Sequence, residues 1–417
     1  MKKVPEIRFN GFKGDWTVKL LDDIFRKVTD KNTDNALVET FTNSAQDGIV
    51  SQRDFFNHDI SNSENIHGYY VVRPDDFVYN PRMSVTAPVG PINRNRLGRA
   101  GVMSPLYTVF KAKNSNYNLG FVEYFFKTDK WHSFMWKNGD NGARGDRFSI
   151  RDEILKLMPI TLPPSNKEQS DISTFFDNLD EYISSQALEL QKLKNIKKAC
   201  LEKMFPKEGE LVPEIRFNGF EGNWVIKTLG ELFTKVTEKN IDNSLTETFT
   251  NSAQEGIISQ RDYFNHDISN IENINVYYVV RPDDFVYNPR MSVTAPVGPI
   301  NRNKLLRSGV MSPLYSVFRA KDERTDLTFL EYFFKTGKWY NFMWKNGDNG
   351  ARGDRFSIRD EVFQLLPIII PPSKKEQISI ANYFSSLDKF ICSTSNKLDK
   401  LKQIRKGLLE KMFVANN

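Results

Sequence analysis

The sequence repeats itself, and this repeat constrains the fold more than any other feature. Val4–Phe205 aligns with Val212–Phe413 at a constant offset of 208 residues, without a gap. The 27 residues of Tyr69–Asn95 recur unchanged. Repeats of solenoid proteins are roughly 20–50 residues long, so a unit of this size is a duplicated domain. The sequence therefore predicts two equivalent halves joined by a short polar linker.

Each copy changes its residue pattern at a double proline. Before LPPSNKEQ and IPPSKKEQ, short aromatic and β-branched runs are bounded by Pro, Asp and Gly, which is typical of strands. After them a long helix is predicted, and Ser165 with Glu168 fits a capping box. We expect an α+β fold of two tandem mixed α/β domains, each followed by a long helix. The expected boundaries are 1–162 for domain 1, 163–205 for helix 1, 206–211 for the linker, 212–370 for domain 2 and 371–413 for helix 2.

Within the first domain, the residue types predict strands at Tyr69–Val72, Phe77–Asn80 and Leu106–Phe110. A helix is predicted over Asn118–Lys127, and Lys137–Ser149 is a glycine-rich turn region. The second copy repeats each of these patterns.

Both long helices carry an apolar stripe that steps by four and three residues. This period of 3.5 residues is typical of a left-handed coiled coil. A helix packed along its own domain is the alternative, but a narrow stripe over about 40 residues favours a helix–helix seam. We expect the two helices to form a coiled coil. The predicted seam residues are Ile172, Phe176, Leu179, Ile183, Leu190, Leu193, Ile380, Phe384, Leu387, Ile391, Leu398 and Leu401.

Charge and cysteine content restrict the classes of function. The net charge of +6 permits nucleic acid as a partner without indicating it. Cys200 and Cys392 have no cysteine counterpart in the other copy, so neither a disulfide nor a zinc site is predicted. No apolar run reaches the roughly 18–20 residues of a membrane span, and the start lacks the apolar segment of a signal peptide. We expect a cytoplasmic protein.

Motifs for catalysis are missing from both copies. GARGDRF lacks the lysine and Ser/Thr of a P-loop, and no GxGxxG follows a predicted strand. The acidic pair in RPDDF has no Glu-x-Lys downstream and fits turn capping better than a nuclease site. VYNPR shares only the first two residues, Asn-Pro, with the Asn-Pro-Pro-aromatic motif of amino-methyltransferases. We expect no catalytic residue, no metal and no cofactor in this chain.

Loops rich in hydrogen-bonding side chains are the candidate functional site. Arg pairs with guanine, Asn or Gln with adenine, and Ser or Thr with either base. Glycines in these loops permit close approach to a phosphate backbone. For Arg147, beside Asp146, an internal salt bridge is the alternative. The predicted DNA-binding residues are Ser44, Gln46, Gln52, Arg53, Asn80, Arg82, Ser84, Thr86, Asn93, Arg94, Asn95, Lys137, Asn138, Arg144 and Arg147, with Ser252, Gln254, Gln260, Arg261, Asn288, Arg290, Ser292, Thr294, Asn301, Arg302, Asn303, Lys345, Asn346, Arg352 and Arg355 in the second copy.

The order of these parts resembles the specificity subunit of type I restriction-modification systems. The matching pieces are PEIRFNGFKGDW, KLLDDIF, DDFVYNPR, GVMSPLYTVF and LPPSNKEQSDISTFFDNLDEYI leading to LEKMF, and all recur in the second copy. The resemblance covers nearly the whole chain. In this family the two recognition domains are usually dissimilar, whereas here they are nearly the same.

The resemblance implies a non-enzymatic subunit that binds double-stranded DNA. Each recognition domain would read one half of a bipartite site. The two helices would pair as an antiparallel coiled coil that acts as a spacer and docks two methyltransferase (modification) subunits and the restriction subunits. S-adenosylmethionine and ATP would belong to those partner subunits. Two alternatives stay open: a stand-alone DNA methyltransferase or endonuclease, and a coiled-coil DNA-binding protein without modification partners.

The near identity of the copies predicts the form of the target. Two matching domains related by a two-fold axis present the same loops to opposite DNA strands. We therefore expect an inverted repeat with a fixed gap, an interrupted palindrome. The copies differ at Ser63 against Ile271 and at Gly68 against Val276, outside the segments assigned to reading.

Overall fold

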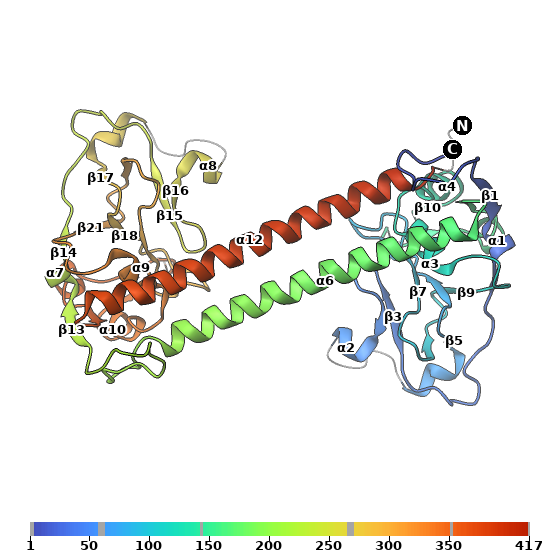
Figure 1. Cartoon of the computed structure of the whole chain (residues 1–417), viewed down its shortest axis with the longest axis horizontal. Coiled ribbons are helices and arrows are strands. Elements are labelled where there is room, and N and C mark those ends of the chain that lie inside the picture. The colour runs from blue at the N-terminus through green and yellow to red at the C-terminus, as the bar shows by residue number, and fades with distance from the viewer. Residues whose placement is uncertain (1–3, 57–62, 142–144, 265–270, 351–352, 416–417) are drawn as a thin grey trace. The chain divides into compact units, whose positions relative to one another are not determined.

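The computed structural model describes residues 4–56, 63–141, 145–264, 271–350 and 353–415. They form two compact units, of which the first is built from two separate stretches of chain and the second from one. The first unit comprises Met1–Ala187 with Asn396–Asn417, and the second comprises Leu188–Ser395. Both long helices are therefore divided between the units, each of which is described below by itself (Figure 1).

The elements of the first copy run in the order β1 Thr17–Leu20, α1 Leu21–Ile24, β2 Phe25–Lys27, β3 Phe41–Ser44, β4 Gly48–Ser51, α2 Gln52–Phe56, η1 Ser63–Gly68, β5 Tyr70–Val72, β6 Phe77–Tyr79, β7 Ile92–Arg94, β8 Gly101–Met103, β9 Thr108–Ala112, α3 Leu119–Phe126, α4 His132–Asn138, β10 Asp140–Asn141, β11 Phe148–Ser149, α5 Asp152–Leu155, β12 Pro159–Leu162 and α6 Asn166–Lys203. The expected strands and the expected helix at 118–127 are confirmed within about two residues, the usual uncertainty of element ends.

The second copy repeats this order as β13 Val225–Thr228, α7 Leu229–Leu232, β14 Phe233–Lys235, β15 Phe249–Ser252, β16 Gly256–Ser259, α8 Gln260–Phe264, η2 Ile271–Val276, β17 Tyr278–Val280, β18 Phe285–Tyr287, β19 Ile300–Arg302, β20 Gly309–Met311, β21 Ser316–Ala320, α9 Leu327–Lys335, α10 Tyr340–Asn346, β22 Asp348–Asn349, β23 Phe356–Ser357, α11 Asp360–Phe363, β24 Pro367–Ile370 and α12 Lys374–Met412. Both long helices are thus where the sequence predicts them.

A four-stranded antiparallel sheet organises each domain, in the order β2-β9-β6-β7 or β14-β21-β18-β19. Side chains alternate across a strand, so β6 serves two cores. Phe77 and Tyr79 belong to the larger apolar cluster, whereas Val78 belongs to a smaller one with Val72 and Val109. Both faces of this sheet are therefore buried, which explains a strand that is apolar at every position.

The end of each long helix lies in the core of the other copy's domain. Phe413, just after α12, packs against Phe121 of α3 with ring centroids 5.0 Å apart and against Trp16 at 6.5 Å. In the second unit Phe205, just after α6, packs against Phe329 at 5.3 Å in the same way. The backbone follows this arrangement, since the amide of Glu6 donates to the carbonyl of Lys411 at 2.9 Å. Neither domain completes its core from its own copy.

Within each unit the two helices run antiparallel. In the first unit Phe176 of α6 lies 6.0 Å from Phe413, whereas Tyr182 lies 5.0 Å from the Lys397 amine, so partner numbers fall along α12 as they rise along α6. None of the predicted seam residues is exposed. The left-handed supercoil of the pair stays a prediction.

The capping box predicted at Glu168 is wrong in its side-chain half. The amide of Glu168 lies 3.5 Å from the Ser165 hydroxyl, but the Glu168 carboxylate turns to Arg8 instead, with contacts of 2.7 and 2.8 Å. The indole of Trp16 donates to the same carboxylate at 3.3 Å. Because the carboxylate is buried, it needs these donors. The segment that carries Arg8 and Trp16, at the start of the first copy, therefore anchors the start of α6 to its domain.

Candidate nucleic-acid interface

Two of the predicted reading segments meet in each unit. Arg290 and Arg355 pair as an isolated antiparallel bridge, and the amide of Phe356 donates to the carbonyl of Pro289 at 2.8 Å. In the first unit Arg82 and Arg147 form the same bridge. Residues opposite each other on such a bridge point to the same face. The fold therefore places the two arginine side chains on the same face.

The arginine bridge forms one wall of an open cleft in the second unit, with a volume of about 740 Å³. The cleft gathers residues from five stretches that are distant in sequence. The predicted DNA-binding residues that line it are Ser252, Gln254, Gln260, Asn288, Arg290, Ser292, Thr294 and Arg355. Aromatic and aliphatic side chains from Tyr263, Leu314 and Tyr315 complete the lining.

The arginines of this cleft are available to a ligand. Within the described part of the chain, neither Arg290 nor Arg355 has a carboxylate within 4.0 Å, and the same holds for Arg82 and Arg147. The internal salt bridge considered for Arg147 is therefore not seen among these residues. Unpaired guanidinium groups are well suited to bidentate binding of guanine or phosphate.

Between these arginines and the sheet, a tight turn projects from the surface. Ser292 and Ala295 exchange backbone hydrogen bonds of 3.0 and 3.2 Å, and the Ser292 hydroxyl also accepts from the Ala295 amide at 3.1 Å. The tip of the turn is Val293, which is fully exposed, as is its counterpart Val85. A fully exposed β-branched apolar side chain contributes nothing to the core.

Glycine fixes the base of this turn. Gly298 has a φ of 85°, and a Cβ at this position would lie 2.0 Å from the backbone oxygen of Asn288. Only glycine avoids both the strain and the clash. The chain therefore turns back sharply here, and the reading segment stands away from the sheet.

A buried asparagine organises the floor of the cleft, and sequence reasoning did not single it out. The side-chain amide of Asn251 donates to the carbonyl of Val286 at 2.7 Å, and its oxygen accepts from Asn301 at 2.7 Å. Its backbone carbonyl accepts from Asn288 at 2.8 Å. Asn43 makes the same contacts in the first unit. These bonds hold two reading segments in fixed register.

One lining group has an unused hydrogen-bonding capacity. The side-chain oxygen of Gln260, the first residue of α8, is buried and has no partner among the described residues. A buried acceptor without a donor is costly. A ligand that offers a donor, such as an exocyclic amine of a base, would satisfy it.

Several predicted residues have structural roles instead. Asn95 and Asn303 are each 1% exposed, and their amides donate to backbone carbonyls at 3.0 Å. Arg94 lies within 3.8 Å of the buried Glu123 and also contacts Asp75. Arg302 is held in the corresponding way, and Asn93 and Asn301 bind the floor asparagines. All six side chains are thus engaged within the protein, and their assignment to DNA binding stays a prediction.

The remaining predicted residues lie around the cleft or away from it. Lys137, Asn138, Lys345 and Asn346 end the helices α4 and α10, and Lys345 contacts Glu208 at 3.4 Å. The hydroxyls of Ser44 and Ser252 accept hydrogen bonds from the backbone amides of Gln46 and Gln254. Gln52, Arg53 and Arg261 lie on α2 and α8. Arg144 and Arg352 lie outside the described residues.

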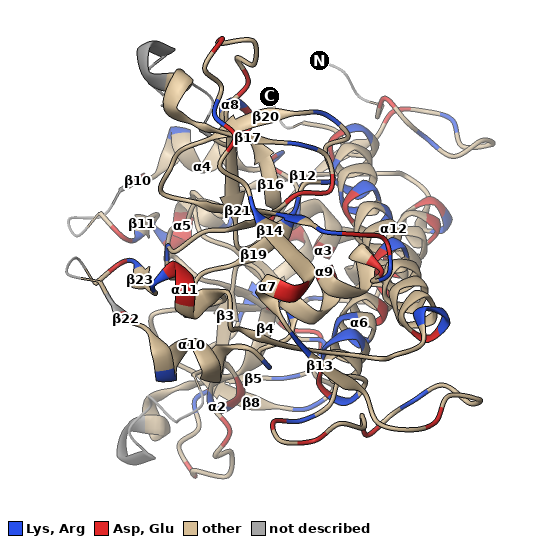
Figure 2. Ribbon diagram, turned by 90° about the vertical axis from the view of Figure 1, so that its left-hand side faces the viewer, with Lys and Arg blue, Asp and Glu red and all other residues tan. Residues whose placement is uncertain are grey.

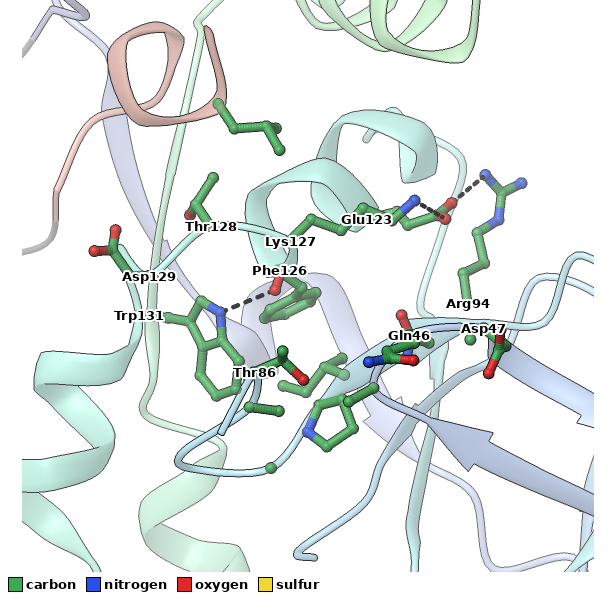
Figure 3. A pocket seen from close by; sticks show the side chains of 18 of the residues that line it. Gln46, Asp47, Thr86, Arg94, Glu123, Phe126, Lys127, Thr128, Asp129 and Trp131 are labelled. Carbon is green, nitrogen blue, oxygen red and sulfur yellow. Dashed lines mark hydrogen bonds and ion pairs between the residues drawn. The ribbon is translucent and has the colours of Figure 1, made fainter. Parts of the chain in front are cut away.

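A second cavity, of about 610 Å³, lies in the first unit (Figure 3). Gln46 and Thr86 line one side, and Lys127 and Arg94 converge on Glu123 at the other, at 3.2 and 3.8 Å. The lining of this cavity carries five acidic and five basic side chains, so its charges balance. The cavity is therefore less suited to a polyanion than the cleft with the unpaired arginines.

Both long helices, α6 and α12, carry Lys or Arg as well as Asp or Glu residues (Figure 2). No cluster of three or more potential metal ligands occurs among the described residues. In the same part of the chain, no helix is long and apolar enough to cross a bilayer.

Residues 221–403 match the family model of the type I restriction modification DNA specificity domain. The second copy therefore carries this domain. The first copy is the same domain, since 134–153 and 342–361 are identical and the repeat aligns without a gap. The family assignment confirms the resemblance on which the sequence analysis relied.

Solved specificity subunits have the same fold over their full length. The S subunit of a type I restriction-modification system from M. genitalium aligns with a TM-score of 0.57 and 13% identity, over 99% of this chain and 100% of that chain. The HsdS subunit from Thermoanaerobacter tengcongensis aligns at 0.50 and 15%, over 99% of both chains. A chain from a study of complex assembly and conformational transition of the type I R-M system aligns at 0.54 and 14%, over 97% of this chain and 99% of that one. Identities this low establish the fold alone.

Proposed function

We propose that this specificity subunit reads a bipartite DNA sequence with its two clefts, one for each half-site. The observation that carries the proposal is the arginine bridge, Arg82 with Arg147 and Arg290 with Arg355, which is repeated in both domains and has no carboxylate partner among the residues that the structure describes. Arginine is the commonest reader of guanine, and a glutamine such as Gln260 suits adenine. The turn tips at Val85 and Val293 supply an apolar contact of the kind that recognises a thymine methyl.

The subunit acts without catalysis of its own and docks two methyltransferase subunits and the restriction subunits. S-adenosylmethionine and ATP belong to those partners, and the complex works on DNA in the cytoplasm. Helix–helix pairing provides the spacer that sets the gap between half-sites. This role is supported by the family, by the mixed charge of the helices, and by reading loops that are nearly identical in the two copies.

A comparison of two preparations tests the proposal. The full chain is co-expressed with its modification subunits, and sequence-specific binding and methyl transfer are measured on DNA. The chain alone should transfer no methyl group from S-adenosylmethionine, whereas the complex should methylate one defined motif. Methyl transfer by the purified chain alone would contradict the non-catalytic role, and a complex without sequence preference would contradict the reading role.

A further inference from the structure

The cleft of the second copy differs from the first copy at a single lining position. Eighteen of its nineteen lining residues are the same as their counterparts 208 residues earlier. The exception is Tyr263, which stands where the first copy has Phe55. The difference lies inside the reading surface, unlike the substitutions at 63 and 68.

Both rings belong to short helices that begin at the cleft. α2 reads QRDFF and α8 reads QRDYF, and the rings of Phe55 and Tyr263 are 44% and 46% exposed. Residues three apart on a helix share a face. Tyr263 therefore lies on the same side of α8 as Gln260, whose oxygen is buried without a partner in the described structure.

The two rings differ in what they offer to a base. Phenylalanine provides an apolar face and edge, which suit stacking or a thymine methyl. Tyrosine keeps these contacts and adds a hydroxyl that both donates and accepts. Among the described residues that line the cleft, every other side chain is the same as its counterpart in the first copy, so the hydroxyl is the one chemical difference in this lining.

We infer that Tyr263 is a specificity-determining residue that reads one base position in the half-site of the second copy. At the equivalent position of the other half-site, Phe55 leaves the choice of base less restricted. The recognised sequence is then an inverted repeat with one asymmetric position. This inference rests on the proposed function, because it requires that the clefts read DNA.

Reciprocal exchange within the chain provides the test. The full chain, in complex with its modification subunits, is used to select sites from a DNA library in which both half-sites are randomised. We expect the wild type to discriminate about three- to tenfold more strongly at one position of one half-site, the effect of a single hydrogen bond. Tyr263→Phe should remove this asymmetry, and Phe55→Tyr should extend the stronger preference to both half-sites.

The outcomes separate this inference from the proposed function. An inverted repeat with equal base preferences in both halves of the wild-type site would overturn the role of Tyr263 alone. So would a Tyr263→Phe protein that binds every sequence more weakly while its motif is unchanged, since that is the behaviour of a phosphate contact. Selection of no motif would overturn the proposed function itself. Phe55→Tyr keeps the test decisive if Tyr263→Phe does not fold, because it adds a hydroxyl to a ring that is already exposed.

Discussion

Arg290 and Arg355 face each other across an antiparallel bridge that joins two loops into one wall of the cleft. If Arg290 reads a guanine, Arg290→Ala should cost about 1–3 kcal/mol and relax one base position of one half-site. Arg82→Ala should have the same effect on the other half-site. Binding is measured on a panel of single-base variants of the selected site.

A matched control is available for this pair. Arg307 is exposed, pairs with Glu247 at 2.7 Å and does not line the cleft, so Arg307→Ala should leave the motif unchanged. An Arg290→Ala protein that loses affinity evenly, with a shallower salt dependence, would place the guanidinium on phosphate instead. No change of either kind would remove Arg290 from the interface.

The turn tip is expected to matter for DNA and not for folding. Val293 is fully exposed, so Val293→Asp should change the free energy of unfolding by less than about 0.5 kcal/mol. A carboxylate in a groove lined by phosphates should nevertheless weaken DNA binding by about tenfold or more, since like charges juxtaposed at an interface cost several kcal/mol. The exposed Ile241, outside the cleft lining, provides the control as Ile241→Asp. Equal affinities for the two variants would show that the turn does not approach DNA.

The helix ends should stabilise the domain of the other copy. Phe413→Ala removes a ring that is 3% exposed from the core around Phe121, and such truncations cost about 3–5 kcal/mol. Hydrogen exchange of the full chain should become faster in β6, β9 and α3, at the far end of the sequence from the mutation. Phe205→Ala should do the same to β18, β21 and α9.

The exposed Ile404 on α12 offers a control, and Ile404→Ala should leave exchange in both domains unchanged. If Phe413→Ala accelerated exchange in the second copy's domain instead, each helix end would have to belong to its own copy.

A pH dependence should distinguish the two domains. Burial raises the pKa of Asp76 to about 6, from an ordinary value of 3.8. Its counterpart Asp284 is instead held by Arg319 through contacts of 2.7 Å, where the first copy has Lys111. Between pH 4 and 6 the folded first domain keeps a proton that the unfolded chain has lost. Its stability should therefore fall as the pH rises through this window, by roughly 1–3 kcal/mol.

Substitution checks the sign of this effect. Asp76→Asn should abolish the fall in stability between pH 4 and 6, and Lys111→Arg should reduce it by recreating the pairing of the second copy. Denaturant unfolding monitored by hydrogen exchange in β5 and β6 reports on the first domain separately. A first domain that becomes more stable as the pH rises through this window would show that Asp76 is charged and paired in the folded state.

Periodicity and residue type predicted the regular elements well. The double proline marks the change from sheet to helix, and the stripe from Ile172 onward predicts α6 because a long helix must bury its apolar side. Composition is a weaker guide for loops. Asn95 and Arg82 both suit base recognition by residue type. The amide of Asn95, however, is buried and bound to backbone carbonyls, whereas Arg82 is exposed. Only the folded backbone decides which groups are already satisfied.

The heptad pattern did not predict that the end of each long helix packs in the domain of the other copy. A heptad stripe predicts that a helix packs against another helix, but it does not predict in which domain the last residues of that helix lie. Phe205 and Phe413 lie 12 residues beyond the last predicted seam residues, Leu193 and Leu401, and an apolar ring beyond a seam was the available signal. The aromatic residues of the cleft were missed for a related reason, since Tyr263 sits in a helix of five residues, too short for any periodicity.

The most direct test of the account is to map the methylated motif of a genome that carries this subunit with its modification partners. Two matching domains that read opposite strands predict an inverted repeat, interrupted by a gap of fixed length. Half-sites should agree at every position except the one assigned to Tyr263. Two unrelated half-sites would contradict the claim that equal clefts read equal sequences, and a gap of variable length would contradict the helices as its spacer.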